Sequence, residues 1–574
     1  MRIHALIVAA VVLAGFVVAR GAEPTTGPAR PLPRFKTPYG AAVNTPESLR
    51  RAVQDLIATF GDRYPKGPEY LAAYEALEKK RAGLKGEALT AAQAEMDALH
   101  AEALLANPLL AEIPELMFVR RGKPEKGFHA SAGGLPPNFT GNSFLYHGPK
   151  GWGTPCDDVR VDDEICILSP VRPTGKVRSV YKSPNEGWVG DVDLHWNGKK
   201  LLFSTAEDFP SRRLNVWEVN TDGTGLRQVS KQDGPYVLPK NKDGSPGKHE
   251  VPVIDFSDAC YLPDGDIICS STLPMIGVPC LGGSIMVGNL YRMDANGGNI
   301  RRLTNDQVDN WCPTVLADGR ILYLRWEYSD IAHNFSRRLF VMNPDGTNQR
   351  AVYGSNSYWP NGQYHARPIP GNPNRFVSLV TGHHGVARRG ELILFDITRG
   401  ERLTEGVIQR IPGHGLKVEP ICADCPVKGG GPLFAHPYPI GERYVITSAA
   451  LPQRSFASIG PDGKRVVQAI QHGLYYVDVF DNVIPVYEVP GENLFEPIPV
   501  RPTPVPQVIP DRITPSAKTA TVYLTDVYAG DGLKGVPRGT VKRLRVYAFH
   551  YVNGHEGGAS CPSATTPSRK SPPW

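Results

Sequence analysis

The run Ala259-Cys-Tyr-Leu-Pro-Asp-Gly-Asp-Ile-Ile-Cys269 places two short apolar segments on either side of the dipeptide Asp264-Gly265. An Asp-Gly or Asn-Gly pair between apolar segments is a strong local signal for a β-hairpin, because both residues accept the backbone angles of a tight turn. The pattern recurs at Asn197-Gly198 and Asp318-Gly319. The sequence therefore predicts a repeated hairpin.

A second class of turn alternates with these hairpins, at Asn220–Gly225 (NTDGTG), Asp294–Asn299 (DANGGN) and Asn343–Asn348 (NPDGTN). Gly198, Gly265 and Gly319 are 67 and 54 residues apart. A four-stranded unit that repeats about every 40–50 residues, lengthened by insertions, is typical of a β-propeller. Such units begin near Asp191, Asp255, Trp311, His365 and Phe434.

One further unit has to be assembled from distant parts of the chain. The predicted strands Glu164–Leu168 and Val177–Tyr181 have no inner partners nearby in the sequence. The extended stretch Glu496–Pro510 could supply them and close the ring. We therefore predict a mainly β fold, with a six-bladed β-propeller over residues 160–512 and seven blades as the alternative.

The segments on either side of the propeller have other compositions. Residues 45–121 predict a small N-terminal helical region, because Thr45 and Pro46 suit a helix start and apolar residues then recur at helical spacing. The Pro-rich residues 23–44 are expected to be a disordered lead. Residues 513–574 are expected to be a truncated C-terminal β segment followed by a disordered tail.

Residues 1–22 have the features of a signal peptide. Arg2 precedes an apolar run of 14 residues, Ala5–Val18, and small residues follow. The run is shorter than the ~20 residues of a membrane-spanning helix, which favours a cleaved export signal over an uncleaved anchor. We expect a periplasmic or secreted protein with no transmembrane segment after signal removal.

Composition excludes several classes of protein. Lys and Arg number 63 against 57 Asp and Glu, and no dense basic stripe is present, so a nucleic-acid partner is not expected. Hydrophobic residues at 41% and charged residues at 21% exclude a disordered chain. The high content of glycine (59) and proline (54) favours a turn-rich β fold over a helical bundle.

The nine cysteines cannot all pair within one chain. Cys260 and Cys269 flank the same turn, so they could form a cross-strand disulfide or remain a free buried pair. Cys422 and Cys425 form a Cys-x-x-Cys run, but Pro426 stands where covalent haem attachment needs histidine. The sequence has no Cys-x-x-Cys-His run, and covalent haem is therefore not expected. A local disulfide or two zinc thiolates stay open for Cys422 and Cys425.

Potential ligands gather on one predicted face of the propeller. The hairpin turns fall on one face, and the links and remaining loops, where function usually lies, fall on the other. The candidate metal ligands are Asp193, His195, Asp258, Cys280, His365 and His384. The candidate ligand-binding residues are Glu327, Asp330, His333, His383, Arg388, Arg389 and His436. This mixture of N, O and S donors would suit zinc.

Each candidate also has a purely structural explanation. Asp193 and Asp258 could instead accept hydrogen bonds from the backbone at the channel mouth. His195, next to Trp196, could be a half-buried histidine with satisfied nitrogens. If the carboxylates do gather, Arg388, Arg389 or a cation should lie among them, because buried like charges repel.

Several motifs together resemble the hydrazine synthase alpha-subunit family. They are Asn107–Leu110 with Leu116–Arg121, Gly190–His195, Cys260–Gly265, Leu290–Asp294, Asp318–Tyr323 with Arg325–Tyr328, and Met342–Asn348. The match covers roughly residues 105–550, and the blades are also similar to those of TolB-type propellers. The resemblance implies an N-terminal region, a propeller, and a C-terminal region that carries c-type haem. It also implies chemistry that joins a nitric-oxide-derived nitrogen to ammonium.

Two functions follow as hypotheses. The first is an exported binding or scaffold module of a redox or nitrogen-metabolism assembly, with protein subunits or a small ligand at the channel face. The alternative is a metal- or haem-dependent oxidoreductase of the hydrazine synthase type that acts with partner subunits. A relative that folds but has lost its chemistry is a third possibility. The sequence shows no phosphate loop or dinucleotide fingerprint that would favour another enzyme class.

Overall fold

The computed structural model describes most of the chain between residues 31 and 545. The described ranges are 31–122, 162–184, 187–205, 214–231, 254–274, 276, 278, 286–327, 336–355, 357–382, 388–421, 431–452, 458–459, 465–466, 471–514, 516–519, 521–529 and 531–545. The predicted signal peptide, residues 1–22, lies outside them.

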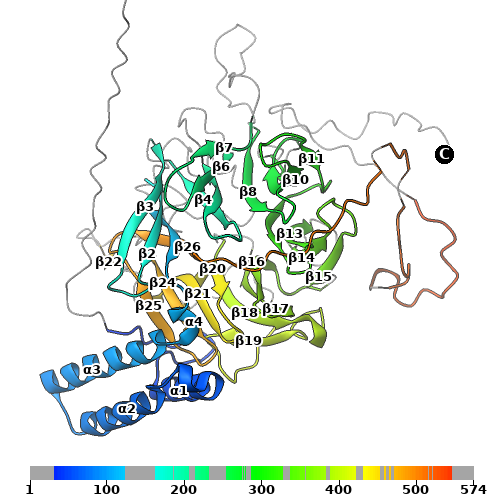
Figure 1. Cartoon of the computed structure of the whole chain (residues 1–574). Helices are drawn as coiled ribbons and strands as arrows, with labels where there is room; N and C mark the ends of the chain where they lie inside the picture. The colour runs from blue at the N-terminus through cyan, green and yellow to red at the C-terminus, as the bar shows by residue number, and fades with distance from the viewer. Residues whose placement is uncertain are drawn as a thin grey trace, which may run out of the picture.

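The helices form a small unit beside the sheets (Figure 1). They are α1 (Pro46–Phe60), η1 (Gly61–Arg63), α2 (Gly67–Arg81), α3 (Gly86–Leu105) and α4 (Pro108–Ala111). Thr45 caps α1 as predicted, because its side chain accepts a hydrogen bond from the Ser48 N–H. Apolar residues of α1 and α3 are buried in one cluster with residues of β1, β21, β24 and β25. Among the described residues, no helix combines the length and the apolar character needed to span a lipid bilayer.

Most of the remaining structure consists of four-stranded antiparallel units, and the predicted mainly β fold is confirmed. The first unit is β26 (Asn493–Pro499), β1 (Leu116–Arg121), β2 (Glu164–Ser169) and β3 (Lys176–Lys182). The second is β4 (Val189–Leu194), β5 (Lys200–Thr205), β6 (Asn215–Asn220) and β7 (Arg227–Gln228). The third is β8 (Phe256–Tyr261), β9 (Ile267–Ser271), β10 (Asn289–Met293) and β11 (Arg301–Arg302).

The later units follow the same order. The fourth is β12 (Asn310–Val315), β13 (Ile321–Glu327), β14 (Ser336–Met342) and β15 (Arg350–Tyr353). The fifth is β16 (Gly362–Ile369), β17 (Asn372–Thr381), β18 (Glu391–Asp396) and β19 (Val407–Ile411). The sixth is β20 (Leu433–Pro439), β21 (Tyr444–Ala450), β24 (His472–Asp478) and β25 (Val483–Tyr487). The short elements are β22 (Ser458–Ile459) with β23 (Arg465–Val466), η6 (Ile397–Arg399) and η8 (Asp531–Leu533).

The units are arranged around a common centre (Figure 1). The inner strand of each unit contacts the inner strand of the next, in the order β4, β8, β12, β16, β20 and β26, and β26 in turn contacts β4. A single parallel pair, Arg337 with Gly362, joins the fourth and fifth units. The inner strands therefore line the middle of the molecule.

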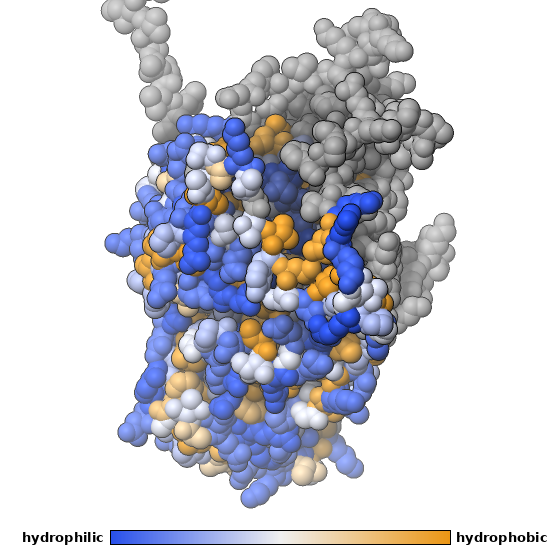
Figure 2. All heavy atoms as spheres, turned by 90° about the vertical axis from the view of Figure 1, so that its right-hand side faces the viewer, coloured by the Kyte–Doolittle hydropathy of each residue, from blue (hydrophilic) through white to orange (hydrophobic). Residues whose placement is uncertain are grey.

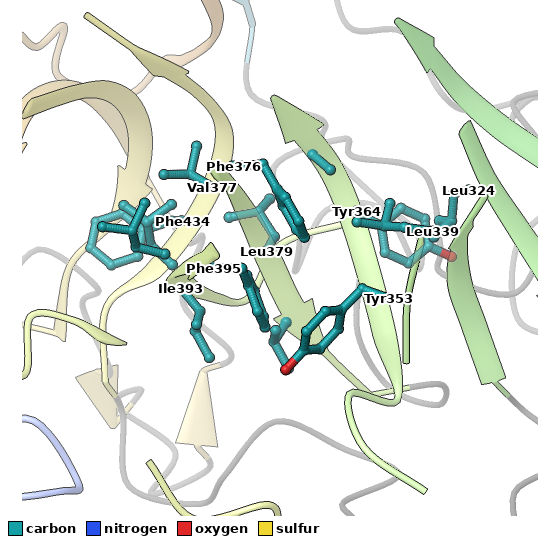
Figure 3. Packing of buried hydrophobic residues seen from close by; sticks show 14 of the residues in the cluster. Leu324, Leu339, Tyr353, Tyr364, Phe376, Val377, Leu379, Ile393, Phe395 and Phe434 are labelled. Atoms are coloured by element: carbon teal, nitrogen blue, oxygen red, sulfur yellow. The ribbon is translucent and has the colours of Figure 1, made fainter. Parts of the chain in front are cut away.

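Apolar side chains on both faces of the sheets form the core, because each sheet is covered by its neighbours (Figure 3). Phe376 and Phe395 stack with their ring centroids 5.1 Å apart, and Tyr353 lies 4.7 Å from Phe395. The Tyr353 hydroxyl donates to the Leu403 carbonyl at 2.6 Å, so its polar end is satisfied. Burying one such side chain contributes about 1.5–3 kcal/mol, so this packing stabilises neighbouring sheets against each other.

The first unit corrects two predictions. Glu496–Pro499 does pair in the sheet of β2 and β3, but it is the innermost strand, next to β1, and β1 is the strand that pairs with β2. Leu116–Arg121, predicted to belong to the helical region, is therefore a buried strand. A short apolar run such as Leu-Met-Phe-Val fits a helix or a strand, so its pattern alone could not decide.

Residues 500–512 do not form strands but run across the ends of other units as a strap, the orange-brown segment that crosses the middle of Figure 1. The Thr503 N–H donates to the Trp196 carbonyl at 2.8 Å. Further along, the Arg512 N–H donates to Asp345 Oδ2 at 2.7 Å. As predicted, the hairpin turns occupy one end of the units, since each connects a first to a second strand or a third to a fourth strand. The strap covers this end.

The predicted disorder of residues 23–44 is wrong for the part that the structure describes. Leu32 and Val43 are buried, and the buried Asn44 side chain donates to the carbonyls of Pro33 and Val483. These contacts hold the segment against the sixth unit. Residues 23–30 lie outside the described residues.

The β segment predicted after residue 512 is also absent from the described residues up to 545. Val522, Tyr523 and Leu524 are exposed there, and no neighbouring strand pairs with them. Strand propensity alone does not form a sheet without a partner. The predicted tail beyond residue 545 lies outside the described residues.

Cys260 and Cys269 are free and buried, which is one of the two predicted alternatives. The register pairs Cys260 with Ile268, so Cys269 points to the opposite face of the sheet. A disulfide between them is therefore excluded by the pleat. Cys422 and Cys425 lie outside the described residues.

Figure 2 shows one side of the molecule, which is mostly hydrophilic. Hydrophobic residues gather there in small groups between hydrophilic ones. Outside the grey atoms, that view therefore offers no single broad apolar patch of the kind that marks many protein interfaces.

Candidate functional site

Every inner strand contains a β-bulge. In β4, for example, Gly190 pairs with Ser204 and Asp193 with Leu202, so Asp191 and Val192 together oppose a single residue. Equivalent register shifts occur in β8, β12, β16 and β20, and in the pairing of β26 with β1. A bulge turns a side chain out of the regular alternation of a strand.

The first residue of each bulge has a left-handed backbone. The six residues are Asp191 (φ 56°), Asp258 (φ 56°), Cys312 (φ 50°), His365 (φ 50°), His436 (φ 48°) and Glu496 (φ 54°). We call them the bulge ring. A left-handed conformation costs a residue other than glycine about 1–2 kcal/mol, yet no glycine occurs at these positions. Strain that recurs at chemically active residues suggests a functional role.

The bulge ring lines one cavity of about 70 Å³. All six residues contribute to its wall. Asp193 and Arg367, each two residues further along its strand, also line it. Side chains from all six units therefore meet at a single place, although they are spread over some 300 residues of sequence.

Three neighbouring ring positions are carboxylates that bind the backbone of the next unit. Glu496 Oε1 accepts from the Asp191 N–H at 3.1 Å, and Glu496 Oε2 accepts from the Val192 N–H at 2.6 Å. Asp191 Oδ2 accepts from the Asp258 N–H at 3.0 Å. Asp258 Oδ2 accepts from the Cys312 N–H at 2.5 Å. Each carboxylate thus stabilises the bulge of the following strand.

The other three positions carry sulfur and nitrogen. Cys312 Sγ lies 3.8 Å from His365 Nδ1, and the rings of His365 and His436 are 4.4 Å apart between centroids. His436 Nε2 lies 3.9 Å from Glu496 Oε1, which completes the circle. In the part of the chain that the structure describes, the buried atoms His365 Nε2 and His436 Nδ1 have no hydrogen-bond partner.

Burial controls the charges around the cavity. Burial, followed by the charge of Asp191, raises the pKa values of Asp258 and Glu496. Burial raises the pKa of Asp193 to about 6. It lowers the pKa of His365 to about 3, so this imidazole is neutral near pH 7. It also raises the pKa of the Cys312 thiol, which therefore stays protonated.

The sequence predicted Arg388, Arg389 or a cation among the carboxylates, and the charge of Arg388 acts on Asp258 although Arg388 is not among the residues that line the cavity. It is 2% exposed, and its Cζ lies 5.7 Å from the ring centroid of Trp311 and 5.9 Å from that of Tyr364. Its charge opposes the rise in the pKa of Asp258. Arg389 is buried as well, and its charge helps to lower the pKa of His472, which is outside the bulge ring.

The structure brings four of the predicted residues to the cavity: Asp193, Asp258, His365 and His436. Asp193 Oδ2 accepts from the Tyr261 N–H at 3.0 Å, so both predicted aspartates bind backbone, the alternative that the sequence left open. Cys280, Asp330, His333, His383 and His384 lie outside the described residues.

Two predicted residues lie elsewhere. His195 Nδ1 accepts from the Asn197 N–H at 3.2 Å, and its ring packs edge-on against Tyr261 at 4.9 Å, so it is the half-buried structural histidine. Glu327 ends β13 and is not among the residues that line the cavity.

The described residues contain no group of three or more His, Cys, Asp or Glu side chains arranged to hold a metal ion. The donors are spaced around a circle, and they do not converge on one point. The zinc prediction included Cys280 and His384, so it is not tested as a whole and stays a prediction.

Sequence reasoning missed Cys312, Glu496 and Arg367 as cavity residues. A repeated tetrapeptide in the inner strands could have revealed them. Its six copies are Gly-Asp-Val-Asp (from residue 190), Ser-Asp-Ala-Cys (257), Trp-Cys-Pro-Thr (311), Tyr-His-Ala-Arg (364), Ala-His-Pro-Tyr (435) and Phe-Glu-Pro-Ile (495). In each, an ionisable residue precedes valine, alanine or proline. Aligning these tetrapeptides as repeats would have found the bulge ring.

Comparisons with known proteins find a partial match. No family model matches the chain. Among curated proteins, hydrazine synthase subunit alpha of Kuenenia stuttgartiensis is 28% identical over 204 residues, which is 29% of this chain and 24% of that protein. The chain resembles the hydrazine synthase alpha subunit. The resemblance inferred from the sequence motifs is confirmed, although the match spans about a quarter of the relative's length.

Solved structures give the same relative at lower similarity. Hydrazine synthase of Kuenenia stuttgartiensis is 17% identical, with a TM-score of 0.48 over 69% of this chain and 48% of that chain. TolB from Acinetobacter baumannii is 11% identical, with a TM-score of 0.34 over 72% of each chain. The argument for function therefore rests on the site.

Proposed function

We propose that the chain is an exported six-bladed β-propeller that binds a ligand at the bulge ring. It would act as a binding or scaffold module of a redox or nitrogen-metabolism assembly. The observation that carries this proposal is the bulge ring, where six strained and chemically active residues occupy equivalent positions and line one cavity. Strained polar residues kept at equivalent places in repeated units are better explained by binding than by stability.

The cyclic contacts between inner strands support a closed ring of six blades. The contact of β26 with β4 and the hydrogen bonds from Glu496 to Asp191 and Val192 join the last inner strand to the first. Such closure removes exposed sheet edges. A seventh blade would have to separate these two strands.

The sequence supports export and partner subunits. Residues 1–22 have the pattern of a signal peptide, which would place the mature chain in the periplasm or outside the cell. The relative is named as subunit alpha of its enzyme, so protein partners are part of this proposal.

Haem and metal content test the proposal. The mature chain, purified after export, should show no haem absorption band and less than stoichiometric metal by elemental analysis. Fractionation should recover it outside the cytoplasm. A covalent haem band, or one tightly bound metal ion per chain, would contradict a purely binding role.

The oxidoreductase alternative has one specific observation in its favour. The bulge ring mixes a thiol, two imidazoles and three carboxylates, and such side chains are also common in metal enzymes. Partner subunits could complete an active centre at this ring. The same haem and metal measurement separates the two functions.

A further inference from the structure

The cavity has an excess of acidic groups. Asp191, Asp193, Asp258 and Glu496 line it, against one arginine, Arg367. Arg388 adds a second positive charge near Asp258. The imidazoles of His365 and His436 are neutral near pH 7 because burial lowers their pKa values. Burial also raises the pKa values of Asp258 and Glu496, so both are partly protonated near pH 7. An entering cation would displace these protons, and the four carboxylates, which outnumber the two arginines, therefore favour a positively charged ligand over an anion.

The arrangement of the acceptors selects the kind of cation. A metal ion needs three or more donors directed at one point, and the described residues provide no such group. The carboxylates of Glu496, Asp191 and Asp258 instead follow one another around half of a circle. A planar guanidinium carries five N–H donors that fan outwards, which matches acceptors spread along an arc.

The other half of the circle suits the face of a guanidinium. His365 and His436 present two neighbouring imidazole rings, tilted by 54° to each other. Guanidinium groups stack on aromatic rings more readily than ammonium groups do. The bulge ring therefore offers carboxylates on one side and the faces of imidazole side chains on the other.

The protein itself contains a guanidinium site of this composition. Arg121, 1% exposed, donates from Nε and Nη2 to the Asp163 carboxylate at 2.7–3.0 Å. Its Cζ lies 5.4 Å from the ring of Trp188 and 5.1 Å from that of Phe495. A carboxylate together with two aromatic rings thus holds a buried arginine, and one of these rings, Phe495, directly precedes Glu496.

We propose that the bulge ring binds a guanidinium group, presented by an arginine side chain of a partner polypeptide. This inference rests on the proposed binding function. The cavity of about 70 Å³ is small, which suits a compact planar head group better than a folded segment of polypeptide. The backbone of the partner would stay at the cavity mouth, and only its arginine would enter.

Calorimetric titration of the mature full-length chain tests the proposal. The probe is an acetylated, amidated tripeptide Gly-Arg-Gly, and the matched control is the same peptide with citrulline, which has nearly the same shape but no charge. We expect the citrulline peptide to bind at least about tenfold more weakly, because it loses charge-assisted hydrogen bonds. Methylguanidinium tests whether the head group alone is sufficient.

Variants locate the binding site. Asp258→Asn and Glu496→Gln should each weaken binding of the arginine peptide about tenfold or more, since each removes a carboxyl group that can ionise against the guanidinium but keeps an acceptor oxygen. Asp318→Asn is the control, because Asp318 lies in an exposed turn at the opposite end of β12 and its ion pair among the described residues is with Arg320 in the same turn. Thermal unfolding of each variant checks that it folds.

Several results would overturn the proposal. They are equal binding of the arginine and citrulline peptides, binding that the two ring variants do not change, or no binding of the arginine peptide. Displacement of the arginine peptide by Zn²⁺ or Ca²⁺ at one ion per chain would also overturn it. These results would leave the broader binding function standing, whereas covalent haem or stoichiometric metal in the purified chain would remove that function itself.

Discussion

Arg121 and Asp163 form a buried ion pair that joins three strands of the first two units. Arg121 belongs to β1, and Asp163 directly precedes β2. The Asp163 carboxylate also accepts from the Val189 N–H in β4 at 2.8 Å, and Arg121 Nη2 donates to the Val189 carbonyl at 2.8 Å. Both side chains are at most 1% exposed. The pair therefore fastens the first unit to the second.

We predict that Asp163→Asn lowers the free energy of unfolding by about 3–5 kcal/mol, because it leaves the buried Arg121 without a compensating charge. The lower part of the range is expected, since asparagine can still accept from the Val189 N–H. Urea unfolding followed by tryptophan fluorescence measures the change, with Trp188 stacked on Arg121 as a local reporter.

The adjacent aspartate supplies the control. Asp162 pairs with Lys182 at 3.0 Å, but the two side chains are 50% and 49% exposed. Asp162→Asn should therefore cost only about 0–1 kcal/mol. The double variant Arg121→Met/Asp163→Asn should lose less free energy of unfolding than the two single variants lose together, because no uncompensated charge remains. If Asp163→Asn costs no more than Asp162→Asn, the reasoning on this pair is refuted.

Two further predictions concern the strap and a buried histidine. Gly319 has a φ of 84°, and a Cβ there would lie 2.1 Å from the Gln507 carbonyl oxygen, whereas at Gly265 (φ 96°) a Cβ would meet nothing within 4 Å. Gly319→Ala should therefore speed proteolysis within residues 500–512, and Gly265→Ala should not. Equal proteolysis rates for the two variants would show that the strap does not pack on this turn. Burial lowers the pKa of His100 from 6.5 to about 4, so its contribution to stability is present above pH 6.5 and is lost as the pH falls towards 4. Between pH 7 and pH 5, the melting temperature of the native protein should fall more than that of His100→Gln, and the difference should correspond to about 2 kcal/mol of stability. If the melting temperatures of the two proteins fall in parallel, His100 is not the group responsible.

The repeated hairpins were readable from the sequence because their information is local. Asp264-Gly265 and its counterparts prescribe a turn by their own backbone preferences, and the flanking apolar runs then pair across it. Likewise, Thr45 and Pro46 identify a helix start wherever the helix lies in the fold.

Long-range pairing was readable only in part. The extended stretch Glu496–Pro510 was expected to supply both missing strands, but its many prolines lack the N–H groups that a sheet requires. Only Glu496–Pro499 joins the sheet, and the strap takes the remainder. The second strand comes from Leu116–Arg121. Its partner β2 begins 48 residues further along and its partner β26 several hundred residues further along, which no local pattern reveals.

Some cavity residues were missed because functional side chains were expected in loops. Cys312 and Glu496 lie inside strands, where side chains are expected to alternate between two packed faces. A bulge breaks that alternation and turns them towards the cavity. His195 illustrates the opposite error, because a histidine close to a hairpin turn met its own local partners and never reached the site.

The central claim is that the bulge ring surrounds an accessible ligand-binding cavity. Chemical labelling of Cys312 tests this claim most directly. Among the described cysteines, Cys312 is the one that is not fully buried, and Cys166, Cys260 and Cys269 serve as internal controls. Labelling with methyl methanethiosulfonate, mapped by peptide mass spectrometry, should modify Cys312 faster than these three. The arginine peptide should slow that reaction, and the citrulline peptide should not. A Cys312 that labels no faster than Cys260, or at the same rate with and without the arginine peptide, would contradict the account.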